Sequence, residues 1–528
     1  MADGSGMTAK AGGRDRVVIV GAGVAGLAAA MELSAAGREV VVLEAAAGPG
    51  GKMRAVPSAA GEIDAGPTVF TQRGVFEDLF AAAGTSLEAE LTVRRAELLA
   101  RNVWPDGSTL DLFDDPARCE AAVEAFAGSA EAARFRAFNA RCRRLFEGFE
   151  GPVMAAERPT PLGVAKAVAG DALRLTRDMA PLSTLWGALG RQFDDPRLCQ
   201  LFARFSTYVG GSPFLSPALL MLIWWSEAKG VWTVEGGMRA LARTMAAVAE
   251  RNGASVRYAS PASRIDVEGG RVRGVILEGG ERIAADAVVF AGDPAALAAG
   301  LLGRETERAA PAMPRTRRSL SAWVWTWAAE PKGFPLSHHT VFFSPDYRAE
   351  FEDLDRRRRP PEDPSLYICA QDRAAAPGAE GPGGPERLLM ILNAPADGDL
   401  GPPSPEEIER CTTTSFARLA QAGLRLSPPD LSETPQALTT PDRFHRMFPA
   451  TGGALYGANP HGAMATFRRP TARSPLPGLY LAGGGCHPGP GVPMATRSGR
   501  RAAEAIMADR ASISASTRTA TRGGTSTG

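Results

Sequence analysis

Arg16-Val-Val-Ile-Val-Gly-Ala-Gly-Val-Ala-Gly-Leu-Ala-Ala-Ala30 is the stretch of sequence that decides the fold. Val17 to Val20 are continuously apolar and β-branched, which is typical of a buried parallel strand. Val24 to Ala36 are mostly small residues that favour a helix. A buried strand, a glycine-rich turn and a helix in this order predict the first unit of an α/β domain.

Three glycines and one acid give this unit a function. Gly21 permits the tight turn, Gly23 lets backbone amides approach a pyrophosphate, and Gly26 allows the helix to pack closely on the strand. A second strand, Glu39 to Leu43, is followed by Glu44, which we expect to accept a hydrogen bond from a ribose hydroxyl. The pattern predicts a dinucleotide site in a Rossmann-like domain.

A second glycine segment, Gly48-Pro-Gly-Gly-Lys-Met-Arg54, follows the second strand. A nicotinamide dehydrogenase does not need it. The segment resembles the glycine pair and basic residue with which flavoproteins of the extended-FAD type close over the pyrophosphate. The resemblance implies FAD contacts at Gly51, Lys52 and Gly66, and the alternative for Gly50-Gly51 is an ordinary turn.

Length and composition fit a large globular enzyme. The 528 residues are enough for two or more domains, and a net charge of +1 gives no reason to expect nucleic acid as a partner. The basic run Arg356 to Arg359 is flanked by acids and prolines and reads as a solvated loop. The six cysteines are scattered without metal or redox spacing, so we expect reduced thiols in the cytoplasm and no metal site.

The FAD domain is expected to be discontinuous, with two insertions that form a substrate domain. The predicted ranges are a disordered tail at 1–14, FAD segments at 15–73, 230–297 and 471–510, a helical insertion at 74–229, a substrate domain at 298–470 and a disordered tail at 511–528. The fold class is thus α/β, a Rossmann-like FAD-binding domain with a β-meander plus a discontinuous substrate domain with a helical insertion.

The later FAD segments have clear periodicity. Met238, Leu241, Met245 and Val248 share one helical face. Strands are expected at 254–258, 264–267, 271–277 and 286–292. The last segment, Gly478 to Met494, is a strand and a glycine-proline loop that leads into a helix at 495–507. Such a helix start offers amide donors and partial positive charge to a reduced flavin.

Three of these regions, Arg16 to Arg54, Gly230 to Met238 and Gly478 to Arg501, resemble bacterial carotenoid desaturases of the phytoene desaturase type. Within that family, Leu112 to Cys119 and Leu201 to Gly211 are most similar to 1-hydroxycarotenoid 3,4-desaturases. The resemblance places Val256 at the adenine and Gly484, Val492 and Met494 at the flavin.

The resemblance implies desaturation of an acyclic carotenoid, with a hydride leaving one carbon for flavin N5 and a proton leaving its neighbour. The flavin does the chemistry, so placement matters more than a strong base. Asp171 and Arg174 are candidates for an acidic-basic pair near the flavin, with a surface ion pair as the alternative. Six tryptophans are candidates to line an apolar tunnel, with core packing as the alternative: Trp224, Trp225, Trp232, Trp323, Trp325 and Trp327.

A carotenoid substrate also implies a membrane surface as partner. The longest apolar run, Ala218 to Trp225, is much shorter than the roughly 20 residues that span a bilayer. We therefore expect a peripheral protein on the cytoplasmic face of the inner (photosynthetic) membrane. Leu162 to Leu185 would form the docking surface, unless it is a plain core-facing helix. Oxygen or a membrane quinone would reoxidise the flavin.

Several other functions remain open from the sequence. A phytoene desaturase or a related carotene desaturase or isomerase would share the same motifs. A flavin amine oxidase shares the first fingerprint, and a non-catalytic prenyl-lipid carrier shares the fold. Cys486-His487 invites an acid/base or covalent-flavin role, although such a pair in a glycine loop more often serves packing.

Overall fold

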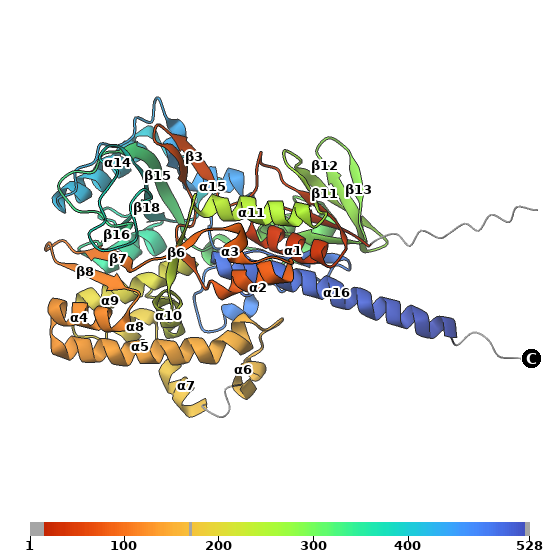
Figure 1. Ribbon diagram of the computed structural model, residues 1–528, viewed down its shortest axis with the longest axis horizontal. Coiled ribbons are helices and arrows are strands. Elements are labelled where there is room, and N and C mark those ends of the chain that lie inside the picture. Colours follow the sequence, from red (N-terminus) through yellow and green to blue (C-terminus); the bar gives the residue numbers. More distant parts are fainter. Residues whose placement is uncertain (1–14, 168–171, 523–528) are drawn as a thin grey trace, which may run out of the picture.

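The computed structural model describes residues 15–167 and 172–522 and has two halves (Figure 1). One half is built on a five-stranded parallel sheet with the order β10-β2-β1-β14-β20. Its strands are β1 (Arg16–Val20), β2 (Glu39–Leu43), β10 (Ser255–Arg257), β14 (Ala287–Phe290) and β20 (Leu479–Leu481). The expected Rossmann-like arrangement is thereby confirmed, and the three separate sequence segments assemble into one sheet.

Each face of this sheet buries its own apolar layer. Val17 and Ile19 point into a core with α1 (Val24–Ala35), α11 (Met238–Arg251) and α16 (Val492–Arg522). Val18 points to the opposite face and packs with a three-stranded antiparallel meander. The meander consists of β11 (Ala262–Glu268), β12 (Arg271–Leu277) and β13 (Arg282–Ala284). The alternation of a continuously apolar strand explains why both faces are covered.

The other half contains a seven-stranded sheet to which both insertions contribute. Its order is β19-β15-β18-β17-β16-β7-β8. The strands are β7 (Leu98–Val103), β8 (Thr109–Phe113), β15 (Ser321–Ala329), β16 (His339–Phe342), β17 (Leu366–Ala370), β18 (Glu386–Ala394) and β19 (Leu438–Thr439). The 74–229 insertion is therefore not wholly helical, because β7 and β8 join the sheet through a parallel pairing of β7 with β16.

Helices cover the two faces of the larger sheet differently. Trp323, Trp325 and Trp327 are buried under α14 (Pro405–Gln421), with Trp327 edge-on to Phe416 at 5.5 Å between ring centroids. The residues that alternate with them, such as Val324, pack toward segments of the first half. These three tryptophans are therefore core residues on the outer face of the sheet.

The first insertion also forms a helical layer with its own aromatic core, in which Trp224 is fully buried against Phe202 and Phe205. Its elements are α4 (Pro116–Ala127), α5 (Ser129–Phe149), η1 (Glu150–Met154), α6 (Pro161–Ala167), α7 (Ala172–Met179), α8 (Leu185–Leu189), α9 (Pro196–Ala203), η3 (Arg204–Val209), η4 (Ala218–Met221) and α10 (Leu222–Ala228).

Smaller elements connect the two halves. A three-stranded sheet, β5-β9-β6, and the hairpin β3-β4 lie at the junction. These elements and the remaining helices are β3 (Ala55–Ser58), β4 (Gly61–Asp64), β5 (Phe70–Thr71), β6 (Val93–Arg95), β9 (Val231–Val234), α2 (Gly74–Ala82), α3 (Leu87–Glu90), α12 (Pro294–Ala298), α13 (Tyr347–Glu352) and α15 (Pro441–Met447).

The C-terminal helix differs from the sequence-based expectation. Helix α16 continues to Arg522, whereas we expected a disordered tail from residue 511. Residues 511–522 are polar but rich in alanine and serine, and they propagate a helix that is already nucleated and packed. In the described part of the chain, no helix is long and apolar enough to cross a membrane.

Candidate functional site

The first glycine turn has the geometry that a phosphate ligand requires. Gly21 has φ 105°, and its N–H donates to the Leu43 carbonyl at 2.7 Å. A Cβ on Gly26 would lie 2.0 Å from the Gly21 carbonyl oxygen, so only glycine lets α1 begin against the turn. A Cβ on Gly23 would meet no atom within 4 Å. Open space thus faces the N-terminus of α1, where backbone amides favour an anion.

The acid predicted to bind a ribose lies at the same turn. One oxygen of the Glu44 carboxylate accepts from the Ala22 N–H at 2.7 Å, and the other accepts from the Ala46 N–H at 2.8 Å. Val256, partly buried on β10, pairs with Val42 on the neighbouring strand. Glu44 and Val256 therefore flank the turn on the side where the second half of a dinucleotide would lie.

The second glycine segment closes onto the first. The Gly50 N–H donates to the Ala22 carbonyl at 2.8 Å, and a Cβ on Gly51 would lie 3.2 Å from the Gly23 Cα. A Cβ on Gly66 would lie 1.8 Å from the Lys52 carbonyl oxygen. Gly50-Gly51 is therefore not an isolated surface turn, because it is held against the dinucleotide turn by glycine-only contacts.

Lys52 reaches from this segment into the other half of the molecule. Its Nζ donates to the Leu455 carbonyl at 2.5 Å and lies 5.1 Å from the ring centroid of Phe448. Burial lowers the pKa of Lys52, and the nearby Asp293 carboxylate opposes that shift. Lys52 therefore fixes the 448–457 loop relative to the glycine turns.

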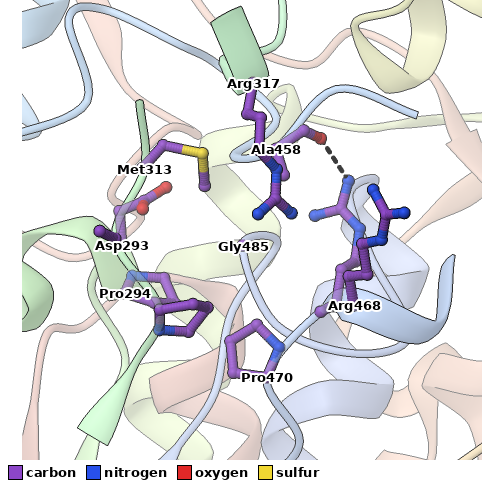
Figure 2. A pocket seen from close by; sticks show the side chains of 11 residues that line it. Asp293, Pro294, Met313, Arg317, Ala458, Arg468, Pro470 and Gly485 are labelled. Carbon is purple, nitrogen blue, oxygen red and sulfur yellow. Dashed lines mark hydrogen bonds between the residues drawn. The ribbon is translucent and has the colours of Figure 1, made fainter. Parts of the chain in front are cut away.

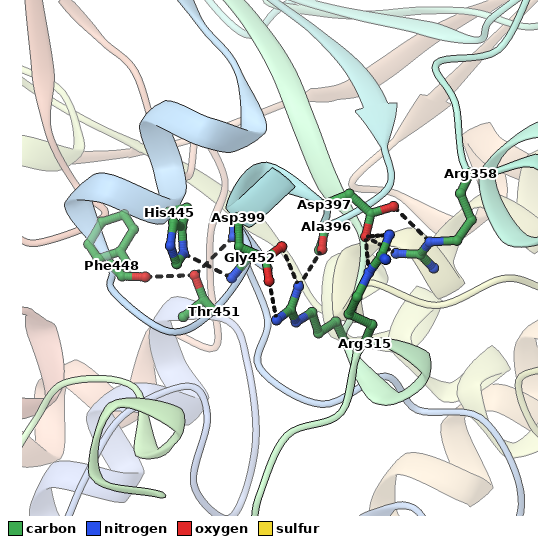
Figure 3. Close-up of polar contacts among 11 residues, drawn as sticks. Arg315, Arg358, Ala396, Asp397, Asp399, His445, Phe448, Thr451 and Gly452 are labelled. Atoms are coloured by element: carbon green, nitrogen blue, oxygen red, sulfur yellow. Dashed lines mark hydrogen bonds and ion pairs between the residues drawn. The ribbon is translucent and has the colours of Figure 1, made fainter. Parts of the chain in front are cut away.

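Arginines hold the neighbouring 396–399 loop, whose Gly398 N–H donates to the Gly452 carbonyl of the 448–457 loop at 2.8 Å (Figure 3). Arg318 makes two contacts of 2.8 Å with Asp399, and the Gly452 N–H donates to His445 Nδ1 at 3.1 Å. Arg358 forms a two-point ion pair with Asp397. The basic run 356–359 is therefore not a solvated loop at Arg358, because this arginine holds the 396–399 loop in place.

The last glycine segment, Gly478 to Met494, is also held by close backbone contacts. Gly483 has φ 127°, and its N–H donates to Ser498 Oγ at 3.1 Å. A Cβ on Gly457 would lie 2.9 Å from the Gly485 Cα. The Gly484 carbonyl accepts from Arg469 at 3.0 Å. The loop leads into α16, whose first residue Val492 is buried and whose third residue, Met494, is half-buried.

A small pocket opens beside this loop (Figure 2). Arg469 donates to the Ala458 carbonyl at 2.8 Å, and burial lowers its pKa to about 10, opposed by Asp293. The pocket is lined by Asp293, Pro294, Pro311, Ala312, Met313, Arg317, Ala458, Arg468, Arg469, Pro470 and Gly485. Basic side chains therefore surround the outer side of the glycine loop.

Cys486 and His487 are enclosed by protein. The Cys486 side chain is fully buried, and burial raises the pKa of its thiol. His487 Nε2 is 2.9 Å from the Ala156 carbonyl, and burial lowers the pKa of its imidazole. These contacts favour the packing role.

A cavity of about 210 Å³ lies where the first segment meets the larger sheet. Asp64 accepts from the Met238 N–H at 2.5 Å, and burial raises the pKa of its carboxyl, opposed by that hydrogen bond. Gln371 bonds both the N–H and the carbonyl of Asp64. The sequence did not predict this contact between Asp64 and Gln371, which connects the Glu62 to Thr68 segment to the larger sheet.

The candidate acidic-basic pair is not brought to the glycine loops by any described contact. Asp171 lies outside the described residues. Arg174 is exposed on α7, whose inner face carries Leu175 and Asp178 onto α5. The contacts of α7 therefore fit a helix at the surface of the helical layer (Figure 1).

Sequence reasoning also missed a buried polar cluster. Thr68 Oγ1 and His339 Nδ1 each lie 2.7 Å from the Tyr367 hydroxyl. Arg204 lies over the Tyr367 ring at 5.5 Å from the centroid. The only sequence signal was that Arg204 falls within Leu201 to Gly211, the stretch that carried the finer resemblance.

Beside this cluster, one possible ligand atom from each of His338, His339 and Cys369 lies within 4.8 Å of the others, although we expected no metal site. His338 Nδ1 already contacts the Arg373 carbonyl at 2.7 Å, and burial raises the pKa of the Cys369 thiol to about 12. His338 and His339 are adjacent in the sequence, but Cys369 lies on a different strand 30 residues later, so their spacing gave no metal-binding motif.

Comparison with known proteins agrees with this geometry. Residues 24–507 match the family described as flavin containing amine oxidoreductase. The chain is 48% identical over 513 residues to a hydroxyneurosporene desaturase of Rubrivivax gelatinosus, covering 97% of each chain. It is 49% identical over 502 residues to one of Cereibacter sphaeroides, covering 94% of this chain and 99% of the relative.

A solved oxidoreductase of Methanosarcina mazei has the same fold, with a TM-score of 0.58 and 18% identity over 93% of this chain and 99% of that one. The family match spans all three glycine segments except the strand and turn that open the first, and it includes both insertions. The chain therefore belongs to the flavin-containing amine oxidoreductase family.

Proposed function

We propose that the protein is an FAD-dependent carotenoid desaturase that introduces a C=C at the 3,4 position of an acyclic, 1-hydroxylated carotenoid. The observation that carries the proposal is the meeting of three glycine segments, with Gly51 against Gly23 and both Gly21 and Gly483 against Ala291, in a chain about 48% identical to hydroxyneurosporene desaturases over nearly its full length. FAD, when bound, supplies the hydride acceptor.

The residues around the open space fit an extended FAD. Gly21, Gly23 and Gly26 would hold the pyrophosphate at the start of α1, and Glu44 keeps further lone pairs for a ribose hydroxyl. Val256 would contact the adenine. The roles of Gly51, Lys52, Gly66, Gly484, Val492 and Met494 are to close over the pyrophosphate and to border the flavin ring.

The apolar substrate suggests delivery from a lipid surface. Leu162 and Leu182 are 66% and 102% exposed at the two ends of the α6–α7 region. Lys166 lies in the last turn of α6. Apolar side chains beside a cation fit a protein that rests on a membrane surface, here the cytoplasmic face. Oxygen or a membrane quinone would be the final electron acceptor.

Product analysis tests the proposal. The chain is expressed in a host that makes acyclic carotenoids, with and without a 1-hydroxylated substrate, and products are separated by chromatography and absorbance. We expect one additional conjugated double bond at the hydroxylated end. Conversion of phytoene would instead identify a phytoene desaturase, and oxidation of amines alone would identify an amine oxidase.

Nicotinamides should not act as electron donors, because the sequence contains a single dinucleotide fingerprint. Anaerobic mixing with NADH or NADPH should leave the flavin absorbance unchanged over the turnover time. Rapid bleaching would contradict a desaturase and indicate a reductase.

A further inference from the structure

The interior beside the glycine loops contains a cation without a carboxylate contact. Arg204 and Tyr208 lie four residues apart on η3, and Arg204 Nη1 donates to the Tyr208 hydroxyl at 3.1 Å. In residues 15–167 and 172–522, no Asp or Glu oxygen lies within 4 Å of the Arg204 guanidinium. Both side chains are deeply enclosed by protein but are not fully buried.

This arrangement leaves hydrogen-bonding capacity unused. A guanidinium has five N–H donors, and the hydrogen bond to Tyr208 uses one of them. The rings of Tyr208 and Tyr367 lie 5.1 and 5.5 Å from the guanidinium and satisfy it only in part. The other N–H groups of Arg204 are not among the fully buried donors without a partner, so they can donate to a polar ligand group that reaches this place.

The cluster adjoins the site proposed for the flavin. A Cβ on Gly210, which ends η3, would lie 2.5 Å from the Tyr456 ring. Tyr456 precedes Gly457, which contacts Gly485 in the last glycine segment. On the other side of η3, Arg204 lies over the ring of Tyr367, whose hydroxyl is bonded to Thr68. Thr68 lies two residues after Gly66, which contacts Lys52. Contacts from both directions therefore place η3 beside the glycine loops.

The proposed reaction needs a polar site at just this position. The hydroxyl oxygen on C1 is separated from C4 by four bonds of about 1.5 Å, so it lies within about 5 Å of the reacting carbons. Any group that binds this hydroxyl must therefore border the flavin. Much of the interior of the helical layer is an aromatic and aliphatic core, which cannot bind a hydroxyl group.

We propose that Arg204 and Tyr208 bind the terminal hydroxyl of the carotenoid and thereby set the preference for a hydroxylated chain end. This inference rests on the proposed function. An Arg204 N–H donates to the hydroxyl oxygen, and the hydroxyl donates to the Tyr208 oxygen. Tyr367 positions the guanidinium, because its own hydroxyl is already bonded to Thr68 and His339.

The charge of the cluster favours a neutral ligand over an anion. Glu227 is buried beside Tyr208, and its carboxylate, when ionised, attracts Arg204 and offsets part of the positive charge. A hydroxyl needs no further countercharge. Discrimination should be strong, because a site with buried polar groups rejects an analogue that leaves them unpaired far better than an apolar pocket can reject an added hydroxyl.

The test compares a 1-hydroxylated acyclic carotenoid with its parent that lacks the hydroxyl, both in liposomes, for wild type, Tyr208→Phe and Arg204→Met. Tyr480→Phe is the matched control, because it removes a tyrosine hydroxyl bonded to Asp509 at 2.8 Å on β20. We expect Tyr208→Phe to lower the ratio of kcat/KM for the hydroxylated carotenoid to kcat/KM for its parent about tenfold, and Arg204→Met to lower this ratio further. FAD content and the Tyr480→Phe ratio should be unchanged.

A second readout does not depend on turnover. Quenching of tryptophan fluorescence by each carotenoid gives a Kd, and only the Kd of the hydroxylated carotenoid should rise in Tyr208→Phe. Equal losses on both substrates, or an unchanged ratio, would overturn the hydroxyl site. Absence of wild-type activity on either carotenoid with FAD bound would overturn the proposed function instead.

Discussion

At the residue scale, the three glycines of the first turn differ in what they exclude. A side chain on Gly26 would collide with backbone, whereas one on Gly23 would enter open space at an ordinary φ of −71°. Gly26 is thus required by the fold, whereas the fold makes no such demand on Gly23, whose role we assign to the proposed ligand. The sequence alone assigned both to one motif, and only atomic distances separate their roles.

Replacement of Gly23 by Leu should leave the fold intact and remove the flavin. The side chain would occupy the space where the pyrophosphate is proposed to lie, so FAD content should fall at least about tenfold. Absorbance at 450 nm relative to 280 nm measures this, and circular dichroism checks the fold. Gly279→Leu is the matched control, since its Cβ also meets nothing within 4 Å. A Gly23→Leu protein with full flavin content would contradict the placement.

At the scale of elements, the region of α6 and α7 has both buried and solvent-exposed apolar side chains. Leu175 is buried on α5 and Asp178 bonds Arg144 at 2.8 Å, so α7 has a core-facing side. Leu162 and Leu182 remain exposed. Leu175 and Asp178 therefore agree with the core-facing interpretation of Leu162 to Leu185, and the exposed leucines are the part for which a lipid-docking surface stays a proposal.

The double substitution Leu162→Asp/Leu182→Asp should weaken binding to anionic liposomes by roughly tenfold or more, because two apolar contacts are lost and two negative charges are added. Co-sedimentation measures binding, and activity on liposome-borne carotenoid should fall in parallel with FAD content unchanged. Leu400→Asp serves as the control, since Leu400 is 68% exposed on a distant loop. Equal binding of the double variant and wild type would exclude this docking surface.

At the scale of the whole molecule, buried acids couple stability to pH. Glu350 is buried, and its carboxylate accepts bonds of 2.7 Å from Ser344 and Ser365. Burial raises its pKa to about 7, and burial raises that of Glu227 to about 7 as well. Between the unfolded pKa near 4.5 and pH 7, the native state binds more protons than the unfolded state.

The free energy of unfolding should therefore contain a contribution that is complete below about pH 4.5 and is lost as pH rises through 7. Glu350→Gln should reduce this decrease in the free energy of unfolding by about 2–3 kcal/mol, and the part of the decrease that is due to Glu227 should remain. Urea denaturation of the FAD-loaded protein at pH 5 and pH 8 measures the difference. An identical decline in wild type and variant would show that Glu350 does not titrate in this range.

The sequence by itself determined the FAD half of the molecule. Glycine spacing, apolar strands and the Met238 to Val248 helical face depend on local backbone geometry, so β1, β2, β10, β12 and α11 lie within a few residues of their expected bounds. Helix α16 is the exception, because it continues to Arg522. The same local rules could not show that β7 pairs with β16, because strands 230 or more residues apart are joined only by tertiary packing.

Only the tertiary structure decided the environment of single side chains. The period-two tryptophans were visible in the sequence, but which face of β15 is covered by α14 was not. Arg204, Tyr367 and His339 come from distant segments and meet because the helical layer packs on the sheet. A sequence fixes which residues share a face of an element, whereas the partner of that face depends on how whole elements bury their apolar area.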